Sequence, residues 1–299
     1  MVKLAAFPKL YMDELCVTRT MSIFEWIDLA AGLPVQGLEM YDAFLMPGYE
    51  KEGEPYLHRV RDKLAGHNLE MPMMCYSPDF TIPDEGARRR EVEKEQRVMR
   101  VTAALGGRYC RVLSGQRRPE VSREQGVDWV AQCIESLFPL AEELGITLTL
   151  ENHYKDNYWI HPEFAQQSDV FCEILDRVPS PLLAVNYDPS NAIIAGEDPI
   201  MLLQKVKKRV VTMHASDRSI KPGYTLDDLA AQENSVGYAS VLQHGEIGQG
   251  LNDFDKIFSI LRDVGFNGWI SIEDGVNGLD ELHRSADFLC RKMAEYWDE

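Results

Sequence analysis

The sequence predicts an α/β protein with a single domain over residues 1–299, folded as a closed (β/α)8 TIM barrel. Short β-type runs alternate with longer helical stretches along the whole chain, which favours a parallel sheet with right-handed crossovers. Eight such units in 299 residues fit a closed barrel better than an open, doubly wound sheet. No glycine-rich phosphate loop follows the first run, although an open dinucleotide-binding sheet would require one.

The expected elements alternate strictly along the chain. The eight strands are Lys3–Phe7, Gly37–Tyr41, Glu70–Cys75, Tyr109–Leu113, Ile146–Glu151, Leu182–Asp188, Val210–His214 and Trp269–Glu273. The eight helices are Ser22–Ala31, Tyr56–Ala65, Gly86–Leu105, Trp129–Leu144, Phe164–Val178, Ile200–Lys208, Asp253–Val264 and Leu279–Trp297. Ser22 and Glu25 form a capping-box pattern at the start of the first helix, and Gly145 is a glycine stop at the end of the fourth.

Residues 219–250 break this alternation, because they are too many for a simple connection between the seventh strand and its helix. A short helix is expected within them, over Thr225–Gln232. A long loop after a barrel strand lies over the catalytic mouth, so we expect an inserted loop that acts as a lid or contacts substrate. An oligomer contact and a mere insertion are the alternatives.

Charge and composition exclude several classes of partner. Lys plus Arg number 31 and Asp plus Glu 48, which gives a formal net charge of −17. This charge argues against nucleic acid and anionic membranes as partners. No apolar run is long enough to cross a bilayer, no signal peptide is visible at the start, and six scattered cysteines indicate reduced thiols. We therefore expect a cytoplasmic protein; a homo-oligomer is compatible with the sequence.

Four consecutive strands end in a polar residue of a metal-binding type: Glu151, Asp188, His214 and Glu273. The active site of a barrel of this kind lies at the carboxyl ends of its strands. Side chains along a strand alternate between two faces, and each of the four falls on the less apolar face of its strand. We therefore expect the four side chains to converge inside one end of the barrel.

Three converging carboxylates would repel one another and become protonated unless a cation neutralised them. A divalent metal held by Glu151, Asp188, His214 and Glu273 is the simplest solution. Three oxygen donors and one imidazole favour Mn²⁺, with Mg²⁺, Co²⁺ or Zn²⁺ as alternatives. For any one of the acids taken alone, a buried salt bridge or a helix cap would explain the residue equally well.

A centre of this kind removes a proton from a carbon next to a carbonyl. The metal acts as a Lewis acid and stabilises the enediolate, and a carboxylate takes the proton. Return of a proton to the opposite face is epimerisation, return to the adjacent carbon is isomerisation, and loss of a leaving group is elimination. The metal ligands do not choose among the three reactions.

Two further residues are candidates for binding the substrate. His153 shares the strand parity of Glu151, so it can serve as an extra base or as a donor to a substrate hydroxyl. An exposed loop histidine is the alternative. Arg111 has inward parity in the fourth strand and is a candidate for binding a hydroxyl or a phosphate. Tyr158 and Trp159 can stack on the apolar face of a sugar ring or belong to the core.

The chain resembles the xylose isomerase-like TIM barrels, the sugar phosphate isomerase/epimerase group that includes the ketose 3-epimerases. The segments that carry the resemblance are Leu148–Asn152, Val185–Pro189, Ala195–Pro199, Val211–Ala215, Gly245–Gly250 and Gly265–Glu273. By position, Glu151, Asp188, His214 and Glu273 look like the four metal ligands of the family, and Glu151 and Glu273 look like its two acid/base carboxylates, on opposite faces of the substrate.

The resemblance also implies substrate-binding residues and one departure. Arg218 falls where the family has a substrate-binding arginine, and Glu39 resembles an acid that recurs at the end of the second strand. Ketose 3-epimerases tend to have a histidine three residues after the metal aspartate, and Asn191 stands there as a candidate for binding substrate. This departure, with the polar and aromatic segment 152–159, weakens the resemblance to the epimerases more than it weakens the metal site.

We therefore expect a divalent-metal-dependent sugar isomerase or epimerase of carbohydrate metabolism, which acts on a small-molecule carbohydrate. The alternative on the same scaffold is a lyase or dehydratase acting on a keto-sugar, keto-inositol or keto-glycoside. An endonuclease-like barrel is disfavoured by the charge of −17 and by only seven histidines. A sugar-binding barrel without catalysis is disfavoured by the four ligand-type residues.

Overall fold

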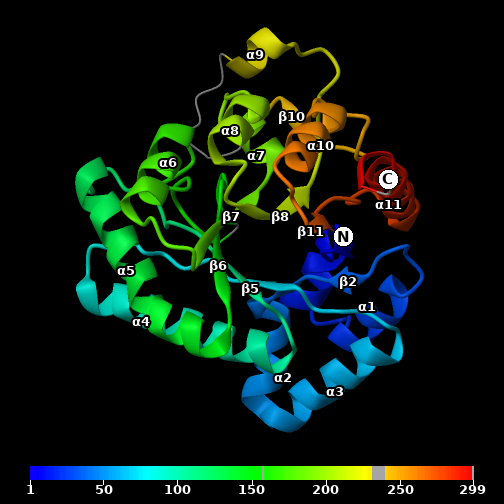
Figure 1. Cartoon of the computed structure of the whole chain (residues 1–299), viewed down its shortest axis with the longest axis horizontal. Helices are drawn as coiled ribbons and strands as arrows, with labels where there is room; N and C mark the ends of the chain where they lie inside the picture. The colour runs from blue at the N-terminus through cyan, green and yellow to red at the C-terminus, as the bar shows by residue number, and fades with distance from the viewer. Residues whose placement is uncertain (157, 231–239, 298–299) are drawn as a thin grey trace.

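The computed structural model describes residues 1–156, 158–230 and 240–297, and it has the predicted barrel architecture (Figure 1). Parallel strands form the ring and helices surround it. The barrel strands are β1 (Lys3–Ala6), β2 (Gly37–Leu38), β3 (Met40–Tyr41), β4 (Met73–Cys75), β5 (Tyr109–Val112), β6 (Thr147–Glu151), β7 (Leu183–Tyr187), β8 (Val210–Ala215) and β11 (Trp269–Ile272). Their order in the sheet is β2-β1-β11-β8-β7-β6-β5-β4-β3.

The two ends of this sheet belong to one barrel strand. β2 and β3 follow each other directly, with only Glu39 between them, so the chain itself joins the first and last members of the order. β1 pairs with β2 on one side and with β11 on the other, which brings the first and last strands side by side. The expected strand Gly37–Tyr41 is therefore present, interrupted at the residue whose side chain enters the site described below.

The eight expected helices are all present. They are α1 (Ile23–Ala30), α3 (Glu54–Gly66), α4 (Glu85–Ala104), α5 (Arg123–Leu144), α6 (Ser168–Arg177), α8 (Pro199–Val206), α10 (Phe254–Asp263) and α11 (Leu279–Trp297). Both hydrogen bonds of the capping box form between Ser22 and Glu25. Gly145 ends α5 with φ of 65°. The α5 helix starts at Arg123 rather than Trp129, because Ser122 caps it.

Other short elements depart from the simple alternation. The first connection contains η1 (Lys9–Tyr11) and a π-helical turn, η2 (Asp13–Val17). The α2 helix (Asp42–Glu52) contains Pro47, a residue that argues against a helix when the sequence is read alone. The α7 helix (Pro189–Ile194) begins directly after β7, where Asp188 caps it. These elements lie near the carboxyl ends of the strands, where the site is built.

The segment after β8 is partly described. It contains β9 (Arg218–Ile220) and β10 (Leu242–His244), which pair antiparallel, and α9 (Leu226–Ala230). The expected helix Thr225–Gln232 agrees with α9 as far as residue 230, and its remainder lies outside the described residues. None of the described residues of 219–250 lines the pocket presented below. The role of this segment over the active site stays a prediction.

The barrel interior confirms the strand parity expected from the sequence. The hydroxyls of Thr149 in β6 and Thr212 in β8 both face the sulfur of Met73 in β4, at 3.4 and 3.7 Å. These inward residues are buried, as are the apolar side chains between strands and helices, such as Trp26, Ile27 and Phe258. Within the described residues, no helix combines the length and the apolar composition needed to cross a membrane.

Candidate metal centre

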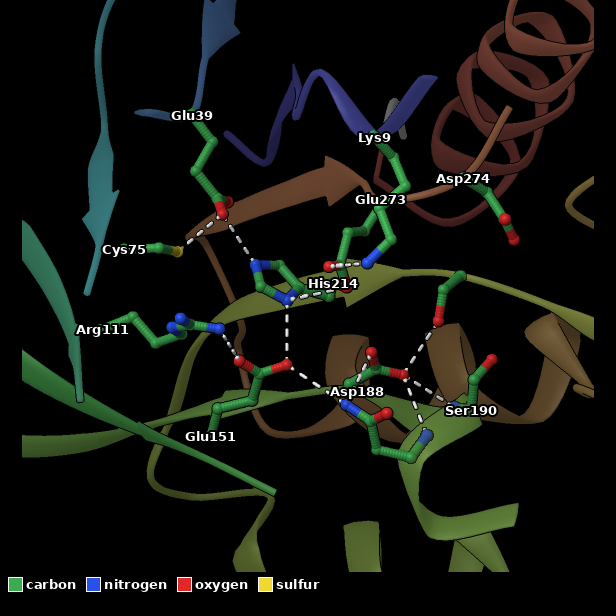
Figure 2. Close-up of polar contacts among 12 residues, drawn as sticks. Lys9, Glu39, Cys75, Arg111, Glu151, Asp188, Ser190, His214, Glu273 and Asp274 are labelled. Atoms are coloured by element: carbon green, nitrogen blue, oxygen red, sulfur yellow. Dashed lines mark hydrogen bonds and ion pairs between the residues drawn. The ribbon is translucent and has the colours of Figure 1, made fainter. Parts of the chain in front are cut away.

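Four side chains meet at the carboxyl ends of four neighbouring barrel strands (Figure 2). Glu151 ends β6, Asp188 follows β7, His214 lies in β8 and Glu273 follows β11. One ligand-type atom of each lies within 4.8 Å of the others. Glu151, Asp188 and His214 are at most 1% exposed, while the Glu273 side chain keeps 12% exposure. The structure thus brings together the four residues that the sequence analysis grouped.

The imidazole of His214 is oriented from both sides. Its Nδ1 lies 3.1 Å from Oε1 of Glu151 and 3.4 Å from Oε2 of Glu273, so this nitrogen faces the cluster. Its Nε2 lies 2.9 Å from Oε1 of Glu39, and the Cys75 thiol donates to the same oxygen at 2.9 Å. A histidine that binds metal through one nitrogen usually donates the other N–H to a carboxylate or carbonyl. His214 and Glu39 have this arrangement.

The charges of the cluster are not balanced by its own residues. Burial raises the pKa of Asp188 to about 7, and the charges of Glu273 and Glu151 act in the same direction. Burial also opposes ionisation of Glu151, but His214 and Arg111 outweigh it and lower the pKa of Glu151 to about 2. An added cation would keep all three carboxylates ionised. Three carboxylates and one imidazole are a donor set that suits a divalent metal, so the residues present fit one.

Asn191 and the start of α7 fix the position of Asp188. The backbone N–H groups of Ser190 and Asn191 donate to Oδ1 of Asp188 at 2.8 and 3.2 Å. The Asn191 side chain donates to Oδ2 of Asp188 at 3.0 Å and to Oε1 of Glu151 at 3.2 Å. Asn191 was expected to bind substrate; it lies between two of the candidate ligands and is 2% exposed.

A pocket opens directly onto the cluster. Its charged and polar lining residues include Lys9, Glu39, Arg111, His153, His214 and Glu273. The Lys9 ammonium donates to Oε1 of Glu273 at 2.9 Å. Lys9 was not among the residues predicted from the sequence. It lies in η1, past the end of β1, so a rule that considers only the residues at strand ends does not reach it.

A family comparison matches nearly the whole of this chain. Residues 27–292 match a family model described as the xylose isomerase-like TIM barrel. The chain belongs to this family. The resemblance and the fold expected from the sequence are therefore confirmed.

Individual relatives of this xylose isomerase-like barrel include enzymes of two kinds. The chain is 24% identical to an inosose dehydratase of Bacillus cereus (strain AH820) over 51% of its own length and 48% of that relative. The chain thus matches about half the length of such curated relatives. A D-tagatose 3-epimerase-like protein superimposes with a TM-score of 0.75, at 17% identity, over 99% of this chain and 98% of that one.

A third relative carries a metal. The IOLI protein, solved with a bound zinc atom, has a TM-score of 0.73 and 16% identity, and the match covers 99% of this chain and 100% of that one. At such identities the two solved structures show the shared fold alone. In this xylose isomerase-like barrel, the four-residue group described above is the set of side chains that could hold a divalent metal.

The remaining predicted residues are placed differently with respect to the pocket. Arg111 lines it and donates to Oε2 of Glu151 at 2.8 Å. His153 also lines it, with Nδ1 3.9 Å from Oε2 of the buried Glu163. Arg218 is 2% exposed, lies 3.8 Å from Asp274 and is not among the pocket residues.

Proposed function

We propose that this xylose isomerase-like barrel is a divalent-metal-dependent lyase of the dehydratase type, acting on a keto-sugar or keto-cyclitol. Glu151, Asp188, His214 and Glu273 would hold the metal, with Mn²⁺ as first choice and Mg²⁺, Co²⁺ or Zn²⁺ as alternatives. When bound, the metal supplies Lewis-acid polarisation of the substrate carbonyl, which acidifies the neighbouring C–H. The residues of the chain must then move the protons.

The observation that carries the choice of reaction is an asymmetry between the two candidate acid/base carboxylates. Glu273 lines the pocket, whereas Glu151 is completely buried and does not line it. The oxygens of Glu151 contact Arg111 on one side and Asn191 and His214 on the other. Those of Glu273 contact Lys9 and His214, so access from the pocket is what distinguishes the two carboxylates. Epimerisation at one carbon needs an acid/base group on each face, while elimination needs a base on one face only. The pocket therefore favours a reaction with one base.

Lys9 completes the machinery for elimination. Glu273 takes the proton from the carbon next to the carbonyl, and the C–O bond at the following carbon breaks. The departing hydroxyl takes a proton from the Lys9 ammonium and leaves as water. Because Lys9 and Glu273 share a 2.9 Å hydrogen bond, the proton held by Glu273 returns to Lys9 and the pair is restored. The inosose dehydratases among the relatives support this reading.

A sugar isomerase is the second candidate, because it too uses a single base. Glu273 would then return the proton to the adjacent carbon of the same substrate, without loss of water. The substrate in both cases is a small carbohydrate that bears a carbonyl.

Product mass separates the two candidates. The manganese-loaded protein is incubated in D₂O with a panel of inososes and keto-sugars and analysed by mass spectrometry and NMR. We expect a product 18 Da lighter than its substrate, from the loss of one water, and no product after Glu273→Gln or after chelation. Glu120→Gln, at an exposed position, is the matched control and should stay active. A product that has lost no water, with either the mass of its substrate or one carbon-bound deuterium more, would establish the isomerase instead.

A further inference from the structure

The two ends of the pocket differ in chemistry. At its deep end lie the charged and polar side chains around the candidate metal ligands. Toward solvent lie Met12, Cys16, Val17 and Tyr158, which we call the apolar rim. The charged residues Asp13, Lys155 and Asp156, from the same two segments, also line the pocket. Val17 is 63% exposed and Tyr158 is 67% exposed, so this rim faces solvent.

The apolar rim is assembled from opposite sides of the barrel. Cys16 and Val17 belong to η2, which follows β1, and Tyr158 belongs to the connection after β6. In the order of the sheet, β1 and β6 stand on opposite sides of the ring. The two segments therefore reach over the pocket from opposite directions. A π-helical turn such as η2 is uncommon and is frequent at functional sites.

The rim leaves apolar surface in water at the position where a bound molecule would cover it. Within the described residues, the exposed large hydrophobic side chains are Met1, Val17, Tyr158, Ile160, Met201 and Tyr224. Two of these, Val17 and Tyr158, line the pocket that contains Glu273. Ligand pockets characteristically combine apolar walls with a few polar groups that fix orientation. Covering apolar surface at the mouth would therefore add to the affinity for a ligand held at the deep end.

We propose that the substrate is a polyhydroxylated keto ring that carries an apolar substituent, aromatic or aliphatic, as a glycoside carries an aglycone. The ring lies at the deep end beside Lys9 and Glu273, and the substituent lies on the apolar rim between Val17 and Tyr158. A free sugar or cyclitol presents hydroxyls on every side and would leave the rim uncovered. This inference rests on the proposed function, since it assumes that the keto ring binds beside Glu273.

A pair of ligands that differ only in the substituent tests this inference. Methyl and phenyl 3-keto-β-D-glucopyranoside are titrated calorimetrically into the manganese-loaded protein. We expect the phenyl glycoside to bind about tenfold more tightly, since the phenyl ring buries more apolar surface. Val17→Ser and Tyr158→Ser should each bring the ratio of the two dissociation constants closer to one. Ile160→Ser is the matched control, at an exposed apolar position that does not line the pocket, and should keep the ratio.

Three results would overturn the inference: equal affinities for the two glycosides, a ratio that survives both rim substitutions, or binding of neither glycoside. Dissociation of an oligomer by Val17→Ser would also overturn it, because a second subunit would then be what covers the rim. The proposed function fails by a different result, namely a protein that binds no metal or that releases water from none of the keto-sugars, inososes and keto-glycosides tested.

Discussion

Glu39 and His214 form a buried pair in which Nε2 of the imidazole lies 2.9 Å from Oε1 of the carboxylate, on the side of the ring away from the other candidate ligands. Figure 2 shows His214 held between Glu39 on one side and Glu151 on the other. The carboxylate can fix the N–H on Nε2 and leave Nδ1 free to accept a metal. Glu39 is therefore expected to act through His214.

Substitution of Glu39 tests this role. Glu39→Gln keeps an oxygen that can accept from Nε2 but removes the charge, and it should weaken Mn²⁺ binding by about tenfold. Competition with a chromophoric chelator measures the affinity. Cys75→Ser keeps a donor to Glu39 and serves as the control, with an affinity close to that of the unmodified protein. An unchanged affinity for Glu39→Gln would show that the pair does not support the metal.

Arg111 is expected to contribute most to the stability of the fold when no metal is bound. Its guanidinium donates to Oε2 of Glu151 at 2.8 Å, and both side chains are buried. Removal of one partner of a buried pair leaves an uncompensated charge, so Arg111→Met should lower the free energy of unfolding by about 3 kcal/mol in chelator.

Mn²⁺ should restore part of that loss, because it supplies positive charge beside Glu151. Urea unfolding with and without the metal gives both values. Arg59→Met breaks a half-exposed pair with Glu52 and should cost less than about 1 kcal/mol. Arg111→Met could instead lower the free energy of unfolding equally with and without metal. That result would contradict the idea that the guanidinium and Mn²⁺ both neutralise Glu151.

Glu163 gives a pH-dependent prediction. Burial raises the pKa of Glu163 to about 8 from its ordinary value of 4.5, although Ser114 donates to Oε1 through its hydroxyl and its backbone N–H. The folded protein therefore holds a proton that the unfolded chain releases. The contribution of Glu163 to stability is complete below pH 4.5 and is lost as the pH rises through about 8.

Glu163→Gln cannot titrate, so its stability relative to the unmodified protein should rise between pH 5 and pH 9. We expect a relative gain of about 4 kcal/mol from this single group. Urea unfolding of both proteins at the two pH values measures it. If the difference in free energy of unfolding between Glu163→Gln and the unmodified protein does not change with pH, Glu163 is ionised in the folded protein.

Gly250 should tolerate no side chain. The Asp217 carboxylate accepts the backbone N–H groups of Gly248 and Gly250 at 2.9 Å each, and that of Asn252 at 3.2 Å. A Cβ at Gly250 would collide with the Asp217 side chain and approach the carbonyl oxygen of Arg218 to 2.5 Å.

We expect Gly250→Ala to lower the free energy of unfolding by about 2 kcal/mol. Gly245→Ala, in the same segment, meets nothing closer than 3.7 Å and should change stability by less than about 0.5 kcal/mol. Thermal unfolding of the two variants compares them. Equal melting temperatures would show that the segment can move away from Asp217.

The strand ends could be predicted because two simple rules act together there. Side chains alternate along a strand, and parallel barrel strands end at the same edge. These rules were enough to bring Glu151, Asp188, His214 and Glu273 to one point, without any knowledge of loop conformations. The positions of Thr149 and Thr212 around Met73 follow from the same alternation.

The partners of those residues were harder to predict, because they depend on register and on irregular segments. Arg111 reaches Glu151 because it stands opposite Thr149 in the β5–β6 pairing. Lys9 reaches Glu273 through η1, a short turn with no clear sequence signal. The α2 helix was missed because Pro47 normally excludes a helix interior. Contacts that cross the barrel cannot be read from local periodicity.

A single diffraction experiment tests the metal centre most directly. Crystals soaked in Mn²⁺ are measured on both sides of the manganese absorption edge. We predict one anomalous peak, at bonding distance from a carboxylate oxygen of Glu151, Asp188 and Glu273 and from Nδ1 of His214. A peak at Nε2 beside Glu39 and Cys75, or no peak near these residues in a protein that remains catalytically active, would contradict it.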